Sequence, residues 1–289
     1  MYDRYKFVIS RPLIPINMTG TLYQIVTLAA YGNAFLKNRI RNPDLSANLS
    51  FQHCNSVTFK VLERPFLFMN KKEKVAAANP ADWFRFLQDG GCQKLRLHYS
   101  PSKDQSAAKD YKLAGFVGGG GTWVIEAVYL NYSEAWAGRW EVTQKDHPDN
   151  QIWSVTYMRI PSQFKTQDLQ IPQQQAKDTL EEALANIESF ALAQNEEGFG
   201  KTFSKARKTL SADTPEQAYY NKHLVPNDYF SLTARQLLYA AGTAWVFGGM
   251  GSWNDLSFGT DEDNATYEAL TERLYHSVNQ AVLCAVNSY

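Results

Sequence analysis

The sequence predicts an α+β protein, with an antiparallel sheet followed by a helical region that packs on it. Most segments before residue 165 alternate apolar and polar residues, whereas apolar residues recur at helical spacing between residues 176 and 285. A polar stretch with two prolines and three consecutive glutamines, residues 161–175, separates the two patterns. We therefore expect a sheet region over 1–165 and a helical region over 173–289, joined as two parts or as one continuous domain.

The first hundred residues are expected to alternate strands and helices. In order, the patterns predict a strand over 5–10, a helix over 21–37, strands over 56–62 and 65–69, a helix over 80–90 and a strand over 94–99. The second helix has the clearest boundary, because Asn79 is a favoured N-cap and Pro80 suits the first helical position. This order, β-α-β-β-α-β, is that of a ferredoxin-like unit, which we consider as one arrangement of the N-terminal region.

Residues 113–160 are predicted to form a meander of longer strands. Trp123, Ile125, Ala127 and Tyr129 fall on one face of the first strand, opposite a set that includes Glu126. Strands over 136–142 and 152–160 follow, joined by a polar turn. Four of the seven tryptophans lie in these strands, so we expect a sheet with a large aromatic face.

Four helices are expected in the second half of the chain. Apolar stripes predict helices over 176–191, 199–210, 232–247 and 267–285. The third of these is apolar nearly all round, which is typical of a helix at the centre of a bundle. Its apolar part is shorter than the ~20 residues that a membrane-spanning helix requires.

Composition and charge limit the classes of function that the sequence supports. The 289 residues include 29 Lys+Arg and 29 Asp+Glu, so the net charge of zero does not favour a protein whose whole surface binds nucleic acid. The three cysteines are far apart and the N-terminal apolar stretch is too short for a signal peptide. We therefore expect a cytoplasmic protein that does not contact a membrane.

The short motifs do not predict a cofactor or a metal. The glycines at 118–121 are followed by a strand, whereas a phosphate-binding loop needs a helix N-terminus there, so we expect a turn. Residues 195–202 approach a Walker A loop, but a predicted helix precedes them. Glu268, Glu272 and His276 share one helical face without a second histidine, which favours a solvated polar face.

No catalytic residues are assigned. The chain has no Gly-x-Ser-x-Gly motif. His53 and Cys54 are neighbours in sequence, but a Cys–His catalytic pair is assembled by the fold, so Cys54 is expected to be a small buried side chain.

The segment after residue 244 supplies the candidate binding residues, Trp245, Trp253, Asn254 and Asp255. Three glycines at 248, 249 and 251 end the apolar segment, and an aromatic, an amide and a carboxylate group then follow in consecutive positions. Large aromatic side chains beside converging polar groups are typical of ligand pockets, which predicts a binding surface here. The alternative is a glycine C-cap followed by a core tryptophan.

Three functions follow as hypotheses. The first is a cytoplasmic binding or assembly protein, with an aromatic surface for a protein or small-molecule partner not identified by the sequence. The second is an RNA-binding component of ferredoxin-like type, for which nucleic acid is the less favoured partner. Its basic clusters are Lys37/Arg39/Arg41, Lys71/Lys72/Lys74 and Lys201/Lys205/Arg207/Lys208. The third is an enzyme whose active site is distributed along the chain without a motif.

Overall fold

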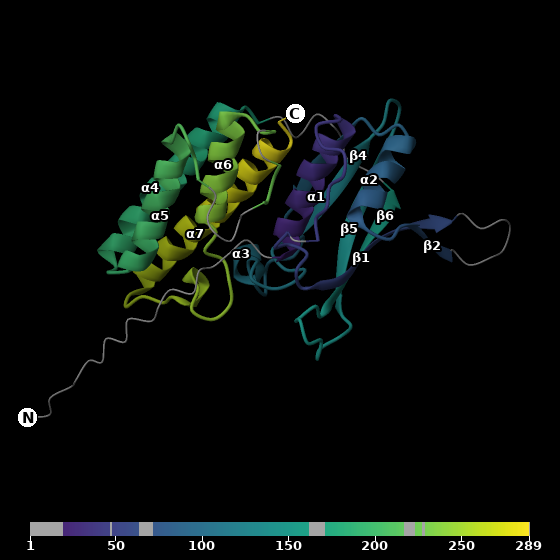
Figure 1. Ribbon diagram of the computed structural model, residues 1–289. Helices are drawn as coiled ribbons and strands as arrows, with labels where there is room; N and C mark the ends of the chain where they lie inside the picture. The colour runs from purple at the N-terminus through teal and green to yellow at the C-terminus, as the bar shows by residue number, and fades with distance from the viewer. Residues whose placement is uncertain are drawn as a thin grey trace, which may run out of the picture.

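The computed structural model describes residues 20–46, 48–63, 72–161, 171–216, 223–226 and 229–288. These residues form a six-stranded sheet that lies beside a group of long helices (Figure 1). The predicted α+β class is therefore confirmed.

The sheet is mixed, which corrects the expectation of a purely antiparallel sheet. Its strands are β1 (Cys54–Glu63), β2 (Lys72–Ala77), β3 (Lys94–Ser100), β4 (Thr122–Val128), β5 (Ser133–Val142) and β6 (Trp153–Pro161), in the order β2-β1-β6-β5-β4-β3. Neighbouring strands are antiparallel except β1 and β6, which run parallel with Val57 beside Val155 and Phe59 beside Tyr157. Alternation of apolar residues shows which side chains share a face but not the direction of the neighbouring strand.

A ferredoxin-like unit is not confirmed. Two of its predicted strands, over 5–10 and 65–69, lie outside the described residues. The edge next to β1 is instead occupied by β2, which the sequence patterns did not predict. Most side chains of β2 are exposed, so the strand lacks the alternation by which a half-buried strand is recognised.

Helices α1 (Gly20–Leu36) and α2 (Pro80–Asp89) lie against the sheet, as predicted (Figure 1). The N-cap of α2 is confirmed, because the Asn79 side chain accepts a hydrogen bond of 2.9 Å from the backbone N–H of Asp82. Beneath the helices, the ring of Phe59 stacks on Trp83 of α2 at 4.4 Å and on Tyr157 of β6 at 5.3 Å, measured between centroids. Of the four tryptophans expected in the aromatic face of the sheet, Trp136 lies in this core against Phe59 and Trp83, whereas the other three are only partly buried.

The remaining helices are α4 (Gln173–Ala193), α5 (Glu197–Ser211), α6 (Leu232–Thr243) and α7 (Asp261–Val286), with the short α3 (Asp110–Leu113) before β4. Helix α6 ends four residues earlier than predicted, and Trp245 and Phe247 are buried in the extended segment that follows. The buried side chains of the sheet, of α1 and α2, and of this bundle form one hydrophobic cluster. No helix of the described ranges is both long and apolar enough to span a membrane.

The outer edge of β3 is covered by two asparagine side chains. Asn33 of α1 donates a hydrogen bond to the carbonyl of Leu95 (2.9 Å) and accepts one from the N–H of the same residue (2.7 Å). Asn287, just after α7, makes the same pair of bonds with Leu97, at 2.9 and 2.7 Å. Each carboxamide takes the place of a peptide group on a neighbouring strand, so β3 does not present an open edge at these residues.

We expect Asn33→Ala to lower the free energy of unfolding by about 2–4 kcal/mol, because it leaves a buried N–H and a buried carbonyl of Leu95 without partners. Asn33 is only 1% exposed, so water does not replace the lost bonds without local opening. Chemical denaturation measures the change. Gln93→Ala, which removes an exposed amide next to β3, is the control, and an equal effect of the two substitutions would contradict this role.

Candidate functional site

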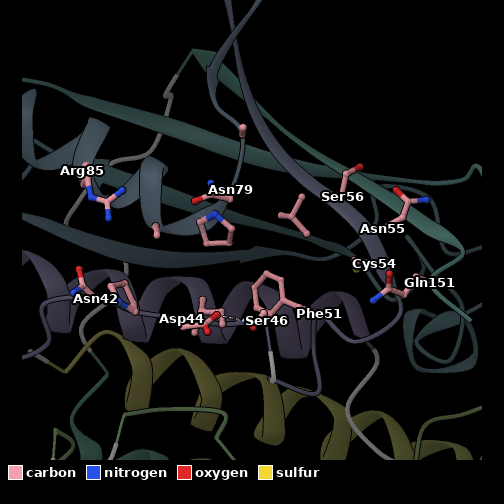
Figure 2. A pocket seen from close by; sticks show the side chains of 16 residues that line it. Asn42, Asp44, Ser46, Phe51, Cys54, Asn55, Ser56, Asn79, Arg85 and Gln151 are labelled. Carbon is pink, nitrogen blue, oxygen red and sulfur yellow. Dashed lines mark hydrogen bonds between the residues drawn. The ribbon is translucent and has the colours of Figure 1, made fainter. Parts of the chain in front are cut away.

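A cleft of about 520 Å³ opens where β1 begins (Figure 2). The segment that follows α1, residues 42–46, forms one wall. The N-terminal end of α2 forms the opposite wall, with residues 78–81 and Arg85. The first residues of β1 and Gln151, from the turn before β6, close the end between the two walls. A volume of this size is typical of sites for small molecules.

The two walls carry opposite charges. Asp44 accepts a hydrogen bond of 2.9 Å from the backbone N–H of Ser46, and this bond lowers the pKa of the Asp44 carboxyl group. Asp44 is therefore ionised at neutral pH. On the other wall, Arg85 makes an ion pair of 2.6 Å with Asp82, which uses one of its five N–H groups. A ligand in the cleft thus meets a carboxylate on one side and a guanidinium group on the other (Figure 2).

Some amides of the cleft are engaged by the protein and others are not. The Asn55 amide donates to the Thr143 hydroxyl at 2.8 Å and accepts from the Ser154 hydroxyl at 2.6 Å, so it holds the end of the cleft in shape. The side chains of Asn42 and Gln151 line the cleft without a hydrogen bond to any residue in the described parts of the chain. Each of these two amides has both a donor and an acceptor to offer.

The floor of the cleft is apolar. Leu45, Phe51 and Val57 are buried and also belong to the hydrophobic cluster of the fold. Their position is therefore fixed by core packing, so the floor does not have to form when a ligand arrives. An apolar floor below a few polar groups is the usual composition of a small-molecule site.

Cys54 borders the cleft but is not an activated nucleophile. Burial raises the pKa of its thiol to about 11, although a hydrogen bond from Gln24, at 3.5 Å from the sulfur, acts in the opposite direction. The thiol is protonated at neutral pH, and the thiolate is the reactive form. His53, its neighbour in sequence, is exposed and contacts Gln52 at 2.9 Å. The structure thus offers binding groups in the cleft but does not pair the cysteine with a base.

The tryptophans of the predicted binding surface lie in the core. Trp253 is 0% exposed, and the rings of Phe199 and Phe203 contact it edge-on at 5.0 and 5.3 Å. Its indole N–H donates to the hydroxyl of Thr271 at 2.8 Å. Trp245 is buried as well, and its N–H donates to the carbonyl of Phe247 at 3.1 Å. The exposed aromatic surface expected here is therefore a packing site between α5, α6 and α7.

Asn254 and Asp255 both have hydrogen-bond partners within the protein. The Asn254 amide donates to the carbonyl of Tyr111 in α3 at 2.8 Å, and Asp255 accepts a hydrogen bond from the N–H of Gly251. Ligand binding by Asn254 and Asp255 stays a prediction, and the hydrogen bonds described here do not add support for it. The sequence shows which polar groups follow the glycines but not that the segment folds back onto α3 and α5.

Close packing explains three of the glycines at 118–121, and a positive φ of 79° explains Gly118. A Cβ atom on Gly120 would lie 2.7 Å from the hydroxyl of Tyr275, and one on Gly121 would lie 2.6 Å from the ring of Tyr99. The loop is a turn, as predicted, and its glycines let it lie directly against α7 and β3.

The acidic face of α7 is largely exposed, as predicted, and its two glutamates also form surface ion pairs. Glu268 pairs with Lys112 at 2.8 Å, and Glu272 pairs with Lys109 at 3.3 Å. Both lysines lie at or beside α3, so the two ion pairs attach this short helix to α7.

The cleft residues were not recognised from the sequence because they belong to separate segments. Asn42 and Asp44 follow α1, Arg85 lies in α2, and Gln151 precedes β6. No fixed spacing connects them. The sequence analysis singled out two cleft residues, Asn79 as the N-cap of α2 and Cys54 beside His53, but neither indicated a cleft.

We expect the thiol of Cys54 to react with iodoacetamide roughly a hundredfold more slowly in the native protein than in the unfolded one at pH 7.5, as the lower thiolate fraction implies. The rate constant should rise with pH until about pH 11. Comparison with Cys54→Ser assigns the reaction among the three cysteines. A native rate equal to the unfolded rate would show an activated thiol instead.

We expect Trp253→Ala to destabilise the protein by ~3–5 kcal/mol, because it leaves a large cavity and an unpaired hydroxyl at Thr271. Thermal and chemical unfolding measure the loss. Phe116→Ala removes an aromatic ring that is 60% exposed and serves as the control. A Trp253 variant as stable as this control would return Trp253 to the predicted binding surface.

Comparison with known families, with curated proteins and with solved structures found no match to this chain.

Proposed function

We propose that the protein is a binding protein for a small zwitterionic molecule, of the amino-acid or short-peptide class, which it holds in the cleft at the start of β1. The observation that carries the proposal is the pair of opposite charges, Asp44 and Arg85, on facing walls above an apolar floor. Asp44 matches an ammonium group, and Arg85 matches a carboxylate, to which guanidinium groups bind with directional hydrogen bonds. An apolar part of the ligand then rests on Phe51 and Val57.

The unengaged amides support a ligand with a peptide-like group. Asn42 and Gln151 each provide one donor and one acceptor toward the cleft, and such a pair complements a group that also carries both. A bound ligand would thus satisfy polar groups for which the described chain provides no partner. This keeps the hypothesis of a binding or assembly protein and moves the site from Trp253 to the cleft.

The RNA-binding hypothesis finds less support, because its basic clusters do not converge. Lys72 and Lys74 on β2 lie at the opposite end of the molecule from the cluster on α5 (Figure 1), and Lys71 lies outside the described residues. Within the α5 cluster, Arg207 pairs with Glu181 and Glu188, which neutralises its charge locally. A nucleic-acid surface depends on several cations that face the same phosphate backbone.

One buried acid–base pair bears on the enzyme hypothesis. His98 of β3 and Glu126 of β4 lie 2.8 Å apart and are 4% and 1% exposed. Burial alone would raise the pKa of Glu126, but hydrogen bonds from His98 and Ser133 outweigh it, so the pKa is lowered. Neither residue lines the cleft. The pair therefore favours a structural role across the β3–β4 ladder.

A test of the proposal is isothermal titration calorimetry with the natural amino acids and a set of dipeptides. We expect at least one of them to bind, and Asp44→Asn and Arg85→Gln each to weaken it about tenfold or more, since each removes a charge-assisted bond. An asparagine at position 44 still accepts the bond from Ser46, so the loop keeps its shape. Asp104→Asn is a matched control, because Asp104 makes the same 2.9 Å bond to the N–H of Ser106 away from the cleft.

Two outcomes would contradict the proposal. One is that no zwitterion of the panel binds, and the other is that Asp104→Asn weakens binding as much as Asp44→Asn does.

The proposal also predicts a pH dependence. Binding of an ammonium group requires the ionised form of Asp44, whose pKa is lowered from its ordinary value of 3.8. Affinity should thus change little from about pH 7 to pH 5, where the ligand's amino group is protonated, and fall only below about pH 4, as the carboxylate becomes protonated. A fall in affinity centred near pH 6 would point to a histidine instead.

A further inference from the structure

A second cavity, of about 420 Å³, lies where the ends of three helices meet. Lys37 and Arg39 follow the C-terminal end of α1, Ser231 is the N-cap of α6, and Ser288 follows α7. These residues and Tyr229 line the cavity. None of them lines the cleft at β1, so this is a separate site.

The cations of this cavity are not neutralised by the protein. Lys37 and Arg39 are exposed, and neither forms an ion pair with any residue that the structure describes. By contrast, Arg207 and Lys112 each pair with a carboxylate within 3 Å. The positive charge at Lys37 and Arg39 is therefore available to a ligand.

Neighbouring groups strengthen the positive potential. Lys94, at the start of β3, has its pKa lowered first by burial and then by the charges of Arg96 and Lys37. Glu126, which acts on the pKa of Lys94 in the opposite direction, is buried and bonded to His98. The Ser231 hydroxyl accepts from the N–H of Ala234 and adds one donor to the cationic side of the cavity, whereas the Ser288 hydroxyl already donates to the carbonyl of Ala285 at 2.8 Å.

We infer that this cavity binds the phosphate group of a small phosphorylated molecule. A phosphate carries nearly two negative charges and three acceptor oxygens, which suits two separate cations together with the hydroxyl donor of Ser231. A carboxylate has only two oxygens and a single charge, so it would leave part of this set unused. The first turn of α6 contains no acidic residue that would repel the anion. The size of the cavity favours a small molecule over a polymer.

The test uses inorganic pyrophosphate as the probe, titrated into the full chain by calorimetry and followed by backbone amide NMR. We expect saturable binding, with the largest shifts at residues 37–39 and 231–233. Lys37→Ala/Arg39→Ala should weaken it roughly tenfold or more. Both side chains are exposed, so this variant is expected to fold, and its thermal unfolding verifies that. Lys205→Ala/Lys208→Ala removes the same charge from exposed positions on α5 and should leave the affinity unchanged.

Three results would overturn the inference. Equal loss in the two double variants would show a nonspecific effect of net charge, and amide shifts confined to another region would place the anion elsewhere. A single-stranded RNA decamer that binds through Lys37 and Arg39 more tightly than pyrophosphate, and is not displaced by it, would assign the surface to nucleic acid.

Discussion

The hydrogen bonds between the edge strand β3 and two asparagine side chains connect the parts of this protein. An edge strand exposes unpaired N–H and carbonyl groups, which must bond to water, to another strand or to a side chain. Here Asn33 from α1 and Asn287 from the end of α7 satisfy Leu95 and Leu97. Because one asparagine belongs to the helix on the sheet and the other to the bundle, the same strand positions both. The bundle is thus attached to the sheet by directional bonds as well as by apolar contact.

The two edge strands of the sheet are protected from pairing with another chain in different ways. At β3 the edge is covered, whereas β2 at the opposite edge carries charged and largely exposed side chains. Charged residues on an edge strand oppose pairing with another chain. Near this second edge, the start of β1 and the N-terminal end of α2 leave the space that becomes the cleft (Figure 2). The proposed binding site therefore lies away from the junction that holds the sheet and the bundle together.

The polar groups of the molecule fall into two classes, buried groups that bond within the fold and exposed groups that are available to a ligand. His98 and Glu126 are paired within the sheet, and Asn33 is hydrogen-bonded to the backbone. These buried groups therefore stabilise the fold and are not available to a ligand. Exposed groups such as Asp44 and Lys37 serve no comparable purpose in packing. Each proposed site includes such a group from the segment after α1, Asp44 in the cleft and Lys37 in the basic cavity, within eight residues of the end of the helix. The segment after α1 is thus common to the cleft and to the basic cavity.

The sequence by itself determined the class of fold and most elements, because a strand or helix with one buried face shows its period in the chain. It also determined the start of α2 at Asn79, since capping is a local interaction. Only the tertiary structure decided the parallel pairing of β1 with β6, the burial of Trp253 and the assembly of the cleft. Each of these depends on contacts between residues far apart in the chain. The local sequence around a tryptophan next to glycines is the same whether the chain folds back over the side chain or leaves it exposed to water. Its burial therefore cannot be deduced from local sequence.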